Sequence, residues 1–507
     1  MRGVYPVEQV RAAEDALMAG LPDGALMARA AYALSVECAQ LLNRTYGARI
    51  ALLVGAGNNG GDALYAGAYL ARRGAQVTAV LLDGQRAHAG GLAALVRAGG
   101  RTAAPDPAVL ADSDLVVDGI VGIGGRGGLR GAAIALAEAA RDYLTVAVDV
   151  PSGVDADTGE VGEVGEVGEV GGAGEVGEVG GAGEVGGAGE VGGASDSAIR
   201  ADVTVTFGAL KPGLLVARGA ERAGEVRLID IGLGATLGAA ETHVLEAADV
   251  AALLPTPGAA DDKYTRGVVG LVAGSAAYPG AGTLATGAAI CGGAGMVRYA
   301  GTAVDAIRAR YPEAVVHDGA RPSELQVQAW VVGPGIGTDD AARDLLRDVL
   351  GTDVAVIADA DAITLIGGAP ELLAGRAAAT VLTPHDREFA RIADGPSADR
   401  LGSARQAAAA LGATILLKGD ATIVAAPDGR AWINPTGTPW LGTAGSGDVL
   451  SGLIGSLLAA GLDAPVAAAV GAYVHGVAGQ LAAAVGPPSS LDVLNSIRGA
   501  LHSIQVG

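Results

Sequence analysis

Positive charge and aromatic side chains are both scarce in this chain. Its 34 lysines and arginines are outnumbered by 55 aspartates and glutamates, which gives a formal net charge of −21 at pH 7. Nucleic acids and anionic membranes are bound through clustered lysine and arginine, so we expect neither as a partner. Only 3% of the residues are aromatic, although 50% are hydrophobic. The core must therefore be built from alanine, valine, leucine and isoleucine.

Cysteines are few, and the hydrophobic runs are interrupted. Cys38 and Cys291 are the two cysteines and lack the CxxC spacing, as expected of two buried thiols in a reducing cytosol. Residues 1–20 have the pattern of an amphipathic helix interrupted by charges rather than that of a signal peptide. The most apolar stretch, residues 449–486, is broken by an aspartate and a proline, which favours buried helices over a membrane span. We expect a soluble cytoplasmic protein that forms a homo-oligomer.

The alternation of short apolar runs with helical patterns predicts an α/β protein with two domains. Residues 1–232 contain strand-like runs such as RIALLVGAG, QVTAVLL and TVAVDVPSG, separated by amphipathic helical patterns. Such runs favour a parallel sheet with helices on both faces, a three-layer αβα arrangement. Residues 233–243 have the composition of a linker, and a second α/β series of the same kind occupies residues 244–507.

A low-complexity insert interrupts the first domain at residues 159–194. Glycine recurs there at every third position, in eight Gly-Glu-Val and four Gly-Gly-Ala triplets. The period is that of collagen, but the tract contains no proline to preset the polyproline II backbone, and its eight glutamates repel one another. We interpret it as a surface loop without fixed structure and, alternatively, as an interaction segment.

The stretch VGAGNNGGD, at residues 54–62, contains the Gly-x-Gly-x-x-Gly pattern of dinucleotide-binding loops. A strand that ends at Gly55 and a helix that starts near Asp62 would turn free N–H groups and the positive end of the helix dipole toward an anion. Asp83, at the end of the next strand, fits the acid that binds a ribose in such units. A tight turn in a glycine-rich protein explains the pattern about as well. The amides and the carboxylate of NNGGD are unusual for a site that binds only a pyrophosphate.

Two other predicted strand ends carry oxygen-rich side chains. Asp118 lies in VVDGIVGIGGRGG, and Asp149 and Ser152 lie in VDVPSGVD. The carboxyl ends of parallel strands converge on one crevice, where these oxygens would suit a hard monovalent or divalent cation. Arg126, in the second glycine loop, would meet a phosphate.

Together the segments GAGNNGGDALYAGAYLARRG, DGIVGIGGRG and AVDVPSGVDADTG resemble the NAD(P)H-hydrate epimerase domain, over roughly residues 1–232 without the insert. The resemblance implies a Rossmann-like domain that takes a damaged nicotinamide nucleotide as substrate and potassium as cofactor. It implies a catalytic role for Asp149 and potassium ligands at Asn59, Asp118 and Ser152. The substrate-binding positions that it implies are Asn58, Asn59, Gly60, Gly61, Asp62, Gly122, Ile123, Gly124, Gly125, Arg126, Gly127, Gly128 and Asp149.

One residue departs from this family's pattern. The family usually has glycine after NNGGD, and this chain has Ala63. Alanine would be strained at a positive φ and harmless in a helix. We favour the helix, because one should be under way at this position.

The glycine-rich stretch GTAGSGDVLSGLIG places Asp448 in the first turn of a predicted helix. N–H groups of residues 443–447 would bind an anion there, and the carboxylate would take a proton from a hydroxyl that is being phosphorylated. For this stretch alone, an aspartate that caps a buried helix is the alternative. KGDATIV, at residues 418–424, adds a lysine suited to a nucleotide phosphate, and TPHDREF places His385 in a turn.

With KYTRGVVGLVAGSAAYPGAGTL and VVGPGIG, these segments resemble the ADP- or ATP-dependent NAD(P)H-hydrate dehydratase of the ribokinase-like superfamily, from about residue 244 to the C-terminus. The resemblance implies a ribokinase-like αβα domain in which Asp448 is the base, with ADP or ATP as co-substrate and Mg²⁺ as cofactor. The nucleotide contacts that it implies are Lys418, Gly419, Asp420, Ala421, Thr422 and Gly447. The hydrate site that it implies is lined by Ala281, Gly337, His385 and Asp448.

The two halves complement each other. Hydration of NAD(P)H gives two epimers, and a stereospecific dehydratase removes only one of them. We therefore expect a bifunctional NAD(P)H-hydrate repair enzyme. The alternative is a ribokinase-like kinase for a vitamin or sugar alcohol, fused to a non-catalytic dinucleotide-binding or scaffold module. The retained Asn59, Asp118, Asp149 and Ser152 argue against a scaffold, which has no need of these oxygens.

Overall fold

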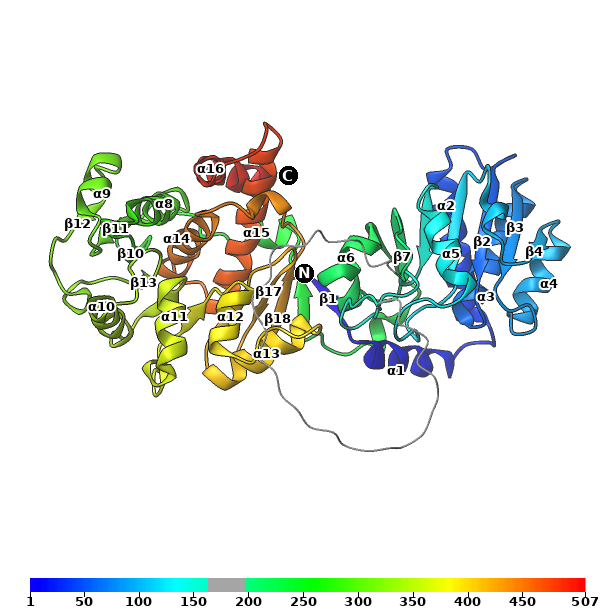
Figure 1. Ribbon diagram of the computed structural model, residues 1–507, viewed down its shortest axis with the longest axis horizontal. Helices are drawn as coiled ribbons and strands as arrows, with labels where there is room; N and C mark the ends of the chain where they lie inside the picture. The colour runs from blue at the N-terminus through cyan, green and yellow to red at the C-terminus, as the bar shows by residue number, and fades with distance from the viewer. Residues whose placement is uncertain (163–196, 507) are drawn as a thin grey trace, which may run out of the picture. The chain divides into compact units, whose positions relative to one another are not determined.

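The computed structural model describes residues 1–162 and 197–506, and it divides the chain into two compact units. Each unit has its own sheet, with helices on both faces (Figure 1). This architecture confirms the predicted two-domain α/β class. The repeat tract falls mostly on residues 163–196, which lie outside the described residues. Its first residues are described, and Val161 is buried and forms an antiparallel bridge with Val154.

The N-terminal unit is built on a parallel sheet of seven strands. From one edge to the other the strands are β4 (Arg101–Ala103), β3 (Gln76–Leu81), β2 (Arg49–Val54), β5 (Leu115–Gly119), β6 (Thr145–Val148), β7 (Val203–Phe207) and β8 (Glu225–Ile229). The chain runs outward from β2 to β4 and then returns to the other side of β2 with β5. The carboxyl ends of β2 and β5 therefore form the topological switch point at which open α/β sheets bind ligands.

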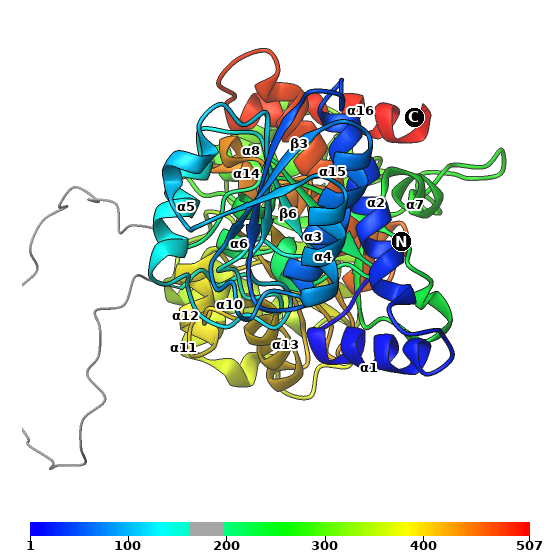
Figure 2. The ribbon, with the colours of Figure 1, turned by 90° about the vertical axis from the view of Figure 1, so that its right-hand side faces the viewer.

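Helices cover both faces of this sheet. Those of the unit are α1 (Val7–Met18), α2 (Ala25–Leu41), α3 (Asn58–Arg72), α4 (Ala89–Arg97), α5 (Ala132–Ala140) and α6 (Ala217–Ala223). Figure 2 shows α2, α3 and α4 on one face and α5 on the other. The buried residues packed between the sheet and α5 are all aliphatic, as the low aromatic content predicts.

The C-terminal unit contains a mixed sheet of eleven strands. In order they are β1 (Arg2–Val4), β9 (Thr242–Val244), β18 (Ala431–Asn434), β17 (Thr422–Ala425), β16 (Thr414–Leu417), β15 (Thr380–Leu382), β14 (Ala355–Ala358), β13 (Ala329–Val332), β10 (Val268–Val272), β11 (Met296–Tyr299) and β12 (Val315–Val316). The strands from β12 to β16 run parallel, and β17 is antiparallel to both of its neighbours.

Two layers of helices enclose this second sheet. The helices are α7 (Ala247–Leu253), α8 (Pro279–Cys291), α9 (Val304–Arg310), α10 (Asp340–Leu350), α11 (Asp361–Gly368), α12 (Asp386–Ile392), α13 (Arg400–Leu411), α14 (Ser446–Ala459), α15 (Ala464–Ala483) and α16 (Ser490–Val506). Helices α8, α14, α15 and α16 pack against one another on one side of the sheet. Among the described helices, α15 alone is long and apolar enough to cross a membrane, but 67% of its apolar window is buried inside the unit. It is a core helix, as we expect for residues 449–486.

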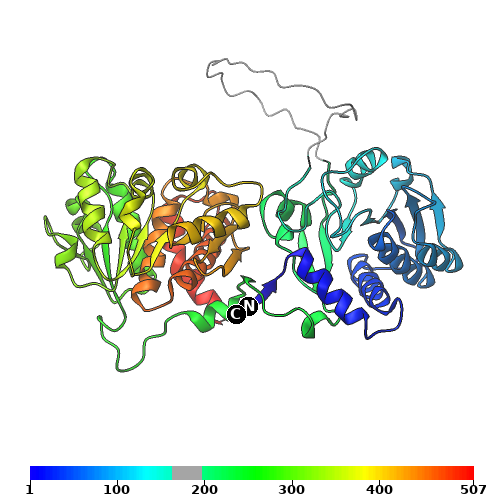
Figure 3. The ribbon, with the colours of Figure 1, turned by 90° about the horizontal axis from the view of Figure 1, so that it is seen from below.

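The two units differ from the predicted domains at the start of the chain. Residues 1–5 group with the C-terminal unit. There β1 pairs antiparallel with β9, as the outermost strand of the sheet (Figure 3). Strand β9 begins inside the predicted linker, residues 233–243. A three-residue strand is too short to show an alternating pattern, and its partner is far along the chain, so local patterns reveal neither strand.

Candidate active sites

The first glycine-rich stretch forms a tight turn between β2 and α3. A Cβ at Gly55 would lie 1.9 Å from the carbonyl oxygen of Ile120, so only glycine permits this close approach of two strand ends. Helix α3 begins at Asn58 rather than near Asp62, with Gly57 as its N-cap residue. The predicted start is wrong by about one turn, because the two glycines of NNGGD have the composition of a loop. The first N–H groups of α3 therefore belong to Asn58, Asn59 and Gly60, and they are free for an anion, whereas the Gly61 N–H donates to the Gly57 carbonyl oxygen.

Ala63 lies inside α3, where it is fully buried, and its φ is not positive. The prediction that Ala63 lies in a helix is confirmed, so the alanine is not strained by its backbone conformation. The methyl group packs beside β5, since a Cβ at Gly119 would come within 2.6 Å of it.

The three predicted potassium ligands meet around residues 120–122. Asp118 is fully buried, and its carboxylate accepts hydrogen bonds from the Ser152 N–H (2.8 Å), the Ser152 hydroxyl (2.6 Å) and the Ile120 N–H (3.2 Å). The Asn59 amide oxygen borders the same turn, 2.8 Å from where a Cβ of Gly122 would lie. No described lysine or arginine forms an ion pair with Asp118, and burial raises its pKa to about 6. A buried carboxylate with oxygen-bearing neighbours fits a cation.

Asp149 follows β6 and forms a buried ion pair that the sequence does not reveal. Its Oδ1 accepts hydrogen bonds from Lys211 Nζ (2.6 Å), Thr206 Oγ1 (3.0 Å) and the Phe207 N–H (3.2 Å). The exposed fraction is 1% for Lys211 and 9% for Asp149. Oδ2 accepts no hydrogen bond from the described residues. Asp149 has a φ of 66°, a left-handed backbone conformation that is unfavourable for residues other than glycine. Such conformations cluster at functional sites.

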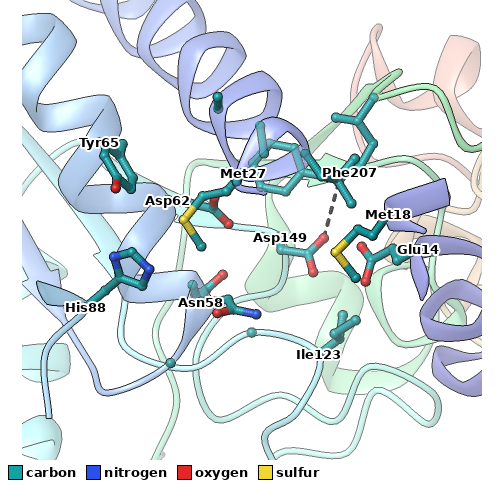
Figure 4. Close-up of a pocket in the computed structure, with 18 of the residues that line it drawn as sticks. Glu14, Met18, Met27, Asn58, Asp62, Tyr65, His88, Ile123, Asp149 and Phe207 are labelled. Carbon is teal, nitrogen blue, oxygen red and sulfur yellow. Dashed lines mark hydrogen bonds between the residues drawn. The ribbon is translucent and has the colours of Figure 1, made fainter. Parts of the chain in front are cut away.

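Asn59 and Asp149 line one pocket of about 1,090 Å³, which has the capacity for a dinucleotide (Figure 4), whereas Asp118, Ser152 and Lys211 lie behind its lining. Its walls come from α1, the following loop, the start of α2, the start of α3 and the turn after β5. The predicted substrate-binding residues that line it are Asn58, Asn59, Asp62, Gly122, Ile123, Gly124 and Asp149. The predicted residues that do not line it are Gly60, Gly61, Gly125, Arg126, Gly127 and Gly128. Asp83 is also outside the lining, and its carboxylate caps a turn by accepting the Gln85 N–H.

Two acids that line the pocket, Asp62 and Glu14, have raised pKa values. Burial raises the pKa of Asp62 well above its usual range, and the neighbouring Asp149 and Glu14 raise it further. Burial and then Asp149 raise the pKa of Glu14, although Lys211 opposes the shift. Figure 4 shows Asp62 and Glu14 on opposite sides of Asp149. Arg11, Glu14 and Asp15 are among the charges that interrupt the N-terminal amphipathic pattern, and all three line this pocket.

In the C-terminal unit, the stretch GTAGSGD forms the start of α14. Gly445 is the N-cap residue at a φ of 88°, and helix α14 begins at Ser446. Asp448 therefore lies in the first turn, beside N–H groups that have no partner within the helix. A Cβ at Gly447 would lie 3.3 Å from Lys418 Nζ. The ammonium group of Lys418, the residue that follows β16, therefore lies beside the N-terminus of α14.

Lys418 is held by carboxylates. Its ammonium group donates to Asp359 Oδ1 at 2.9 Å and lies 3.8 Å from Glu388 Oε2. Asp359 is buried, and its Oδ2 accepts the Ser451 hydroxyl at 2.7 Å. Although burial favours the neutral acid, Lys418 and the hydrogen bonds keep the pKa of Asp359 below its usual value. The lysine predicted to contact a nucleotide is therefore also the partner of a buried aspartate.

The pKa of Asp448 is shifted in the opposite direction from that of Asp359. Burial raises its pKa to about 7, and the charge of Asp359 raises it as well, while Lys418 opposes the shift. Asp361 and Glu388 add smaller contributions that raise it. A carboxylate with a pKa close to neutrality is suited to general acid–base catalysis.

The structure places the other predicted residues of this half in several elements. Ala281 lies in the first turns of α8, and Gly337, at a φ of 86°, donates its N–H to Asp361 Oδ2 at 2.9 Å. His385 is the N-cap residue of α12, where its Nδ1 accepts two backbone N–H groups and its side chain stays half exposed. Residues 419–421 form the turn between β16 and β17, and Thr422 is the first residue of β17.

Sequence reasoning missed Lys211 and Asp359, for which a signal existed. The chain has just three lysines, Lys211, Lys263 and Lys418; Lys211 is buried beside Asp149, and Lys418 is partly buried beside Asp359. Rare lysines after apolar strands are therefore informative here. Among the described residues, no group of three or more His, Cys, Asp or Glu side chains could hold a metal ion.

Comparison with known proteins gives independent findings for each half. Residues 23–213 match the family model of the YjeF-related protein N-terminus, and residues 269–492 match that of NAD(P)H-hydrate dehydratase. The bifunctional NAD(P)H-hydrate repair enzyme of Mycobacterium tuberculosis is 47% identical over 478 residues, which cover 92% of both chains. That of Mycobacterium leprae is 46% identical and covers 99% of this chain and 100% of its own.

A solved structure matches the second half. The ADP/ATP-dependent NAD(P)H-hydrate dehydratase from Bacillus subtilis, co-crystallized with ATP/Mg²⁺, is 30% identical and covers 52% of this chain and 98% of its own, with a TM-score of 0.46. The identity to the mycobacterial enzymes over nearly the whole chain decides the assignment. The chain belongs to the family of bifunctional NAD(P)H-hydrate repair enzymes, with an N-terminal epimerase part and a C-terminal ADP-dependent dehydratase part.

Proposed function

We propose that the pocket of the N-terminal unit interconverts the two epimers of hydrated NAD(P)H, with Asp149 as its catalytic base. The observation that carries this proposal is the buried ion pair between Asp149 and Lys211 beside the pocket. Lys211 holds Oδ1 of Asp149 in place, while Oδ2 accepts no hydrogen bond from the described residues. A carboxyl group that is fixed in position and accessible from a pocket can exchange a proton with a bound ligand.

The epimers differ at one ring carbon, C6, which bears the added hydroxyl. To invert this carbon, one of its bonds to oxygen or to nitrogen must break and form again on the opposite face of the ring. In the route through nitrogen, Asp149 takes the hydroxyl proton as the C6 carbonyl forms and the C6–nitrogen bond opens, with the electron pair of that bond moving to the ring nitrogen. The proton returns to the oxygen when the nitrogen attacks the opposite face of C6, so the reaction consumes nothing. The N–H groups at the start of α3 bind a phosphate of the nucleotide and orient the ring toward Asp149.

Asn59, Asp118 and Ser152 are the proposed potassium ligands of this unit. Their meeting around residues 120–122, and the burial of the Asp118 carboxylate without a described cationic partner, support the assignment. When bound, the ion supplies positive charge next to the turn that borders the substrate pocket. It would offset the charge of Asp118 and favour an anionic substrate.

In the C-terminal unit, Asp448 is the proposed base for the transfer of phosphate from ADP or ATP. Asp448 takes the proton of the C6 hydroxyl while the hydroxyl oxygen attacks the terminal phosphorus, and AMP or ADP leaves. Phosphate then leaves C6 with the electron pair of the carbon–oxygen bond, and loss of a proton from the adjacent ring carbon, C5, restores the ring double bond of NAD(P)H. The free N–H groups of α14 and the Lys418 ammonium lie where they would stabilise the charge on the transferred group.

The magnesium of this step would enter with the nucleotide. The described residues offer no cluster of three or more metal-binding His, Cys, Asp or Glu side chains, and Mg²⁺ is commonly held by substrate phosphates with one or two carboxylates. When bound, it neutralises phosphate charge. Asp448, in the first turn of α14, and Asp361, whose charge acts on Asp448, are the carboxylates that would lie beside the nucleotide phosphates.

The test is NADH recovery from a mixture of both hydrate epimers, with potassium, magnesium and either ADP or ATP. We expect full recovery, with one phosphate released for each NADH formed. Replacing potassium by choline at the same ionic strength should slow conversion of the R-epimer alone. A phosphorylated product that is retained, without release of phosphate, would instead support a ribokinase-like kinase. Failure to restore NADH with either nucleotide would overturn the proposal.

A further inference from the structure

The pocket of the N-terminal unit has an unbalanced set of charges. Its lining carries five carboxylates, Glu14, Asp15, Asp23, Asp62 and Asp149, and a single lysine or arginine, Arg11. The proposed substrate is an anion, because the pyrophosphate of NADHX carries two negative charges and NADPHX adds a 2′-phosphate. A phosphate must therefore find a cation or free N–H groups in this pocket, or be repelled.

Arg11 is placed next to a substrate-binding segment. It lies on α1, and its guanidinium Nη2 donates to the carbonyl oxygen of Ile123 at 3.3 Å. The same nitrogen lies 3.1 Å from where a Cβ of Gly124 would be. Ile123 and Gly124 both line the pocket, and Figure 4 shows Ile123 at its edge. Glycine at position 124 leaves room for the guanidinium group to adjoin the backbone.

The guanidinium group has donors to spare. It carries five N–H donors, and the long contact with Ile123 uses one of them. Arg11 is exposed and forms no close ion pair with a described residue, although the charge of Glu14, one turn along α1, interacts with it at longer range. Helix α1 itself is fixed, because the Val7 N–H donates to Asp157 Oδ1 at 2.7 Å. Most N–H donors of Arg11 therefore remain available to a ligand at the edge of the pocket.

We propose that Arg11 binds a phosphate group of the hydrated dinucleotide during epimerisation, and so determines its affinity. This inference rests on the proposed epimerase function. Arg11 lies outside residues 23–213, which match the N-terminal family model. Two phosphates fit the chemistry, the pyrophosphate common to both substrates and the 2′-phosphate of NADPHX. Arginine binds either through paired N–H groups.

The experiment compares the full-length wild type with Arg11→Met, Arg11→Lys and Arg97→Met. Arg97 is the matched control, because it lies on α4 and is not part of the pocket lining. Epimerase kcat and KM are measured for NADHX and for NADPHX, together with competitive inhibition by inorganic pyrophosphate. Thermal unfolding of each variant shows whether the fold is retained.

We expect Arg11→Met to raise KM about tenfold, the effect of losing one charge-assisted hydrogen bond, with kcat within about twofold. A rise for both substrates, with weaker inhibition by pyrophosphate, assigns Arg11 to the pyrophosphate. A rise for NADPHX alone assigns it to the 2′-phosphate. Arg11→Lys should recover part of the affinity, and Arg97→Met should match the wild type.

Two results would overturn the inference, and they differ from failure of the proposed function. An unchanged KM in Arg11→Met for both substrates shows that Arg11 does not bind phosphate. A loss of kcat alone, at unchanged KM, shows that it positions residues 122–124 instead. If the wild type and Arg97→Met epimerise neither substrate, the proposed function fails and the inference with it.

Discussion

Replacing Asp359 should move the pH dependence of dehydration. Asp359 is a buried carboxylate that accepts from Lys418 at 2.9 Å and from Ser451 at 2.7 Å. After burial, its charge is the largest influence that raises the pKa of Asp448 to about 7, and Lys418 opposes it. Asp359→Asn removes the negative charge and releases Lys418 from its partner. Both changes favour ionised Asp448, so the pKa of Asp448 should fall.

The magnitude follows from the ionised fraction of the base. If the pKa of Asp448 is about 7, about 3% of it is ionised at pH 5.5, so kcat/KM at this pH is about 3% of its plateau. A fall of about one pKa unit, equivalent to about 1.4 kcal/mol, raises the ionised fraction to about 24%. The activity of the variant at pH 5.5, relative to its own plateau, should therefore be about eightfold higher than that of the wild type.

The assay is kcat/KM for S-NADHX dehydration between pH 5 and pH 9, with the plateau of each variant as its own reference. Ser451→Ala is the matched control, because it disturbs the same buried group without changing its charge. Its acid limb should coincide with that of the wild type. An acid limb in Asp359→Asn that stays in place or moves to higher pH would refute the reasoning. So would a profile without an acid limb near pH 7 in the wild type.

Three further predictions concern stability. Lys211→Met should lower the free energy of unfolding of the N-terminal unit by about 3–5 kcal/mol, because it leaves the buried Asp149 without its cationic partner. The same substitution should abolish epimerisation but not dehydration. Denaturant titration and both activity assays test this. Ala63→Gly should cost about 1 kcal/mol, the loss of a good helix former in α3, and leave epimerase kcat intact; a large loss of activity would contradict it. The pKa of Asp448 in the folded state is about 7, above its ordinary value of 3.8. Between these pH values the folded state binds more protons than the unfolded state, so the free energy of unfolding falls as pH rises from about 4 to about 7. Asp448→Asn should therefore stabilise the C-terminal unit at pH 8, by at most about 4 kcal/mol, and have little effect near pH 4; equal stabilisation at both pH values would count against this.

The sequence predicts the parts of both sites that lie at strand ends. Asp118, Asp149 and Ser152 follow short apolar runs, and parallel strands bring such ends together whatever the details of packing. The glycine patterns and the two family resemblances then assign the chemistry. Asp448 is recognisable for the same reason, because the glycines around it predict a helix terminus.

The partners of these residues could not be predicted, because they come from distant parts of the chain. Lys211 and Asp359 become partners of Asp149 and Lys418 only through the order of strands in each sheet. Arg11 reaches the pocket because α1 packs beside the turn after β5, which no local pattern encodes. The start of α3 at Asn58 was missed because glycine disfavours helices by propensity, whereas tertiary packing decides its conformation here.

The central claim is that two independent sites in one chain act in sequence, and complementation tests it most directly. Asp149→Ala and Asp448→Ala are assayed for NADH recovery from a mixture of both NADHX epimers, first separately and then mixed. We predict that Asp149→Ala rapidly recovers only the S-epimer fraction, that Asp448→Ala recovers none, and that the mixture recovers all. Full recovery by Asp149→Ala alone at the wild-type rate, or no gain on mixing, would contradict the account.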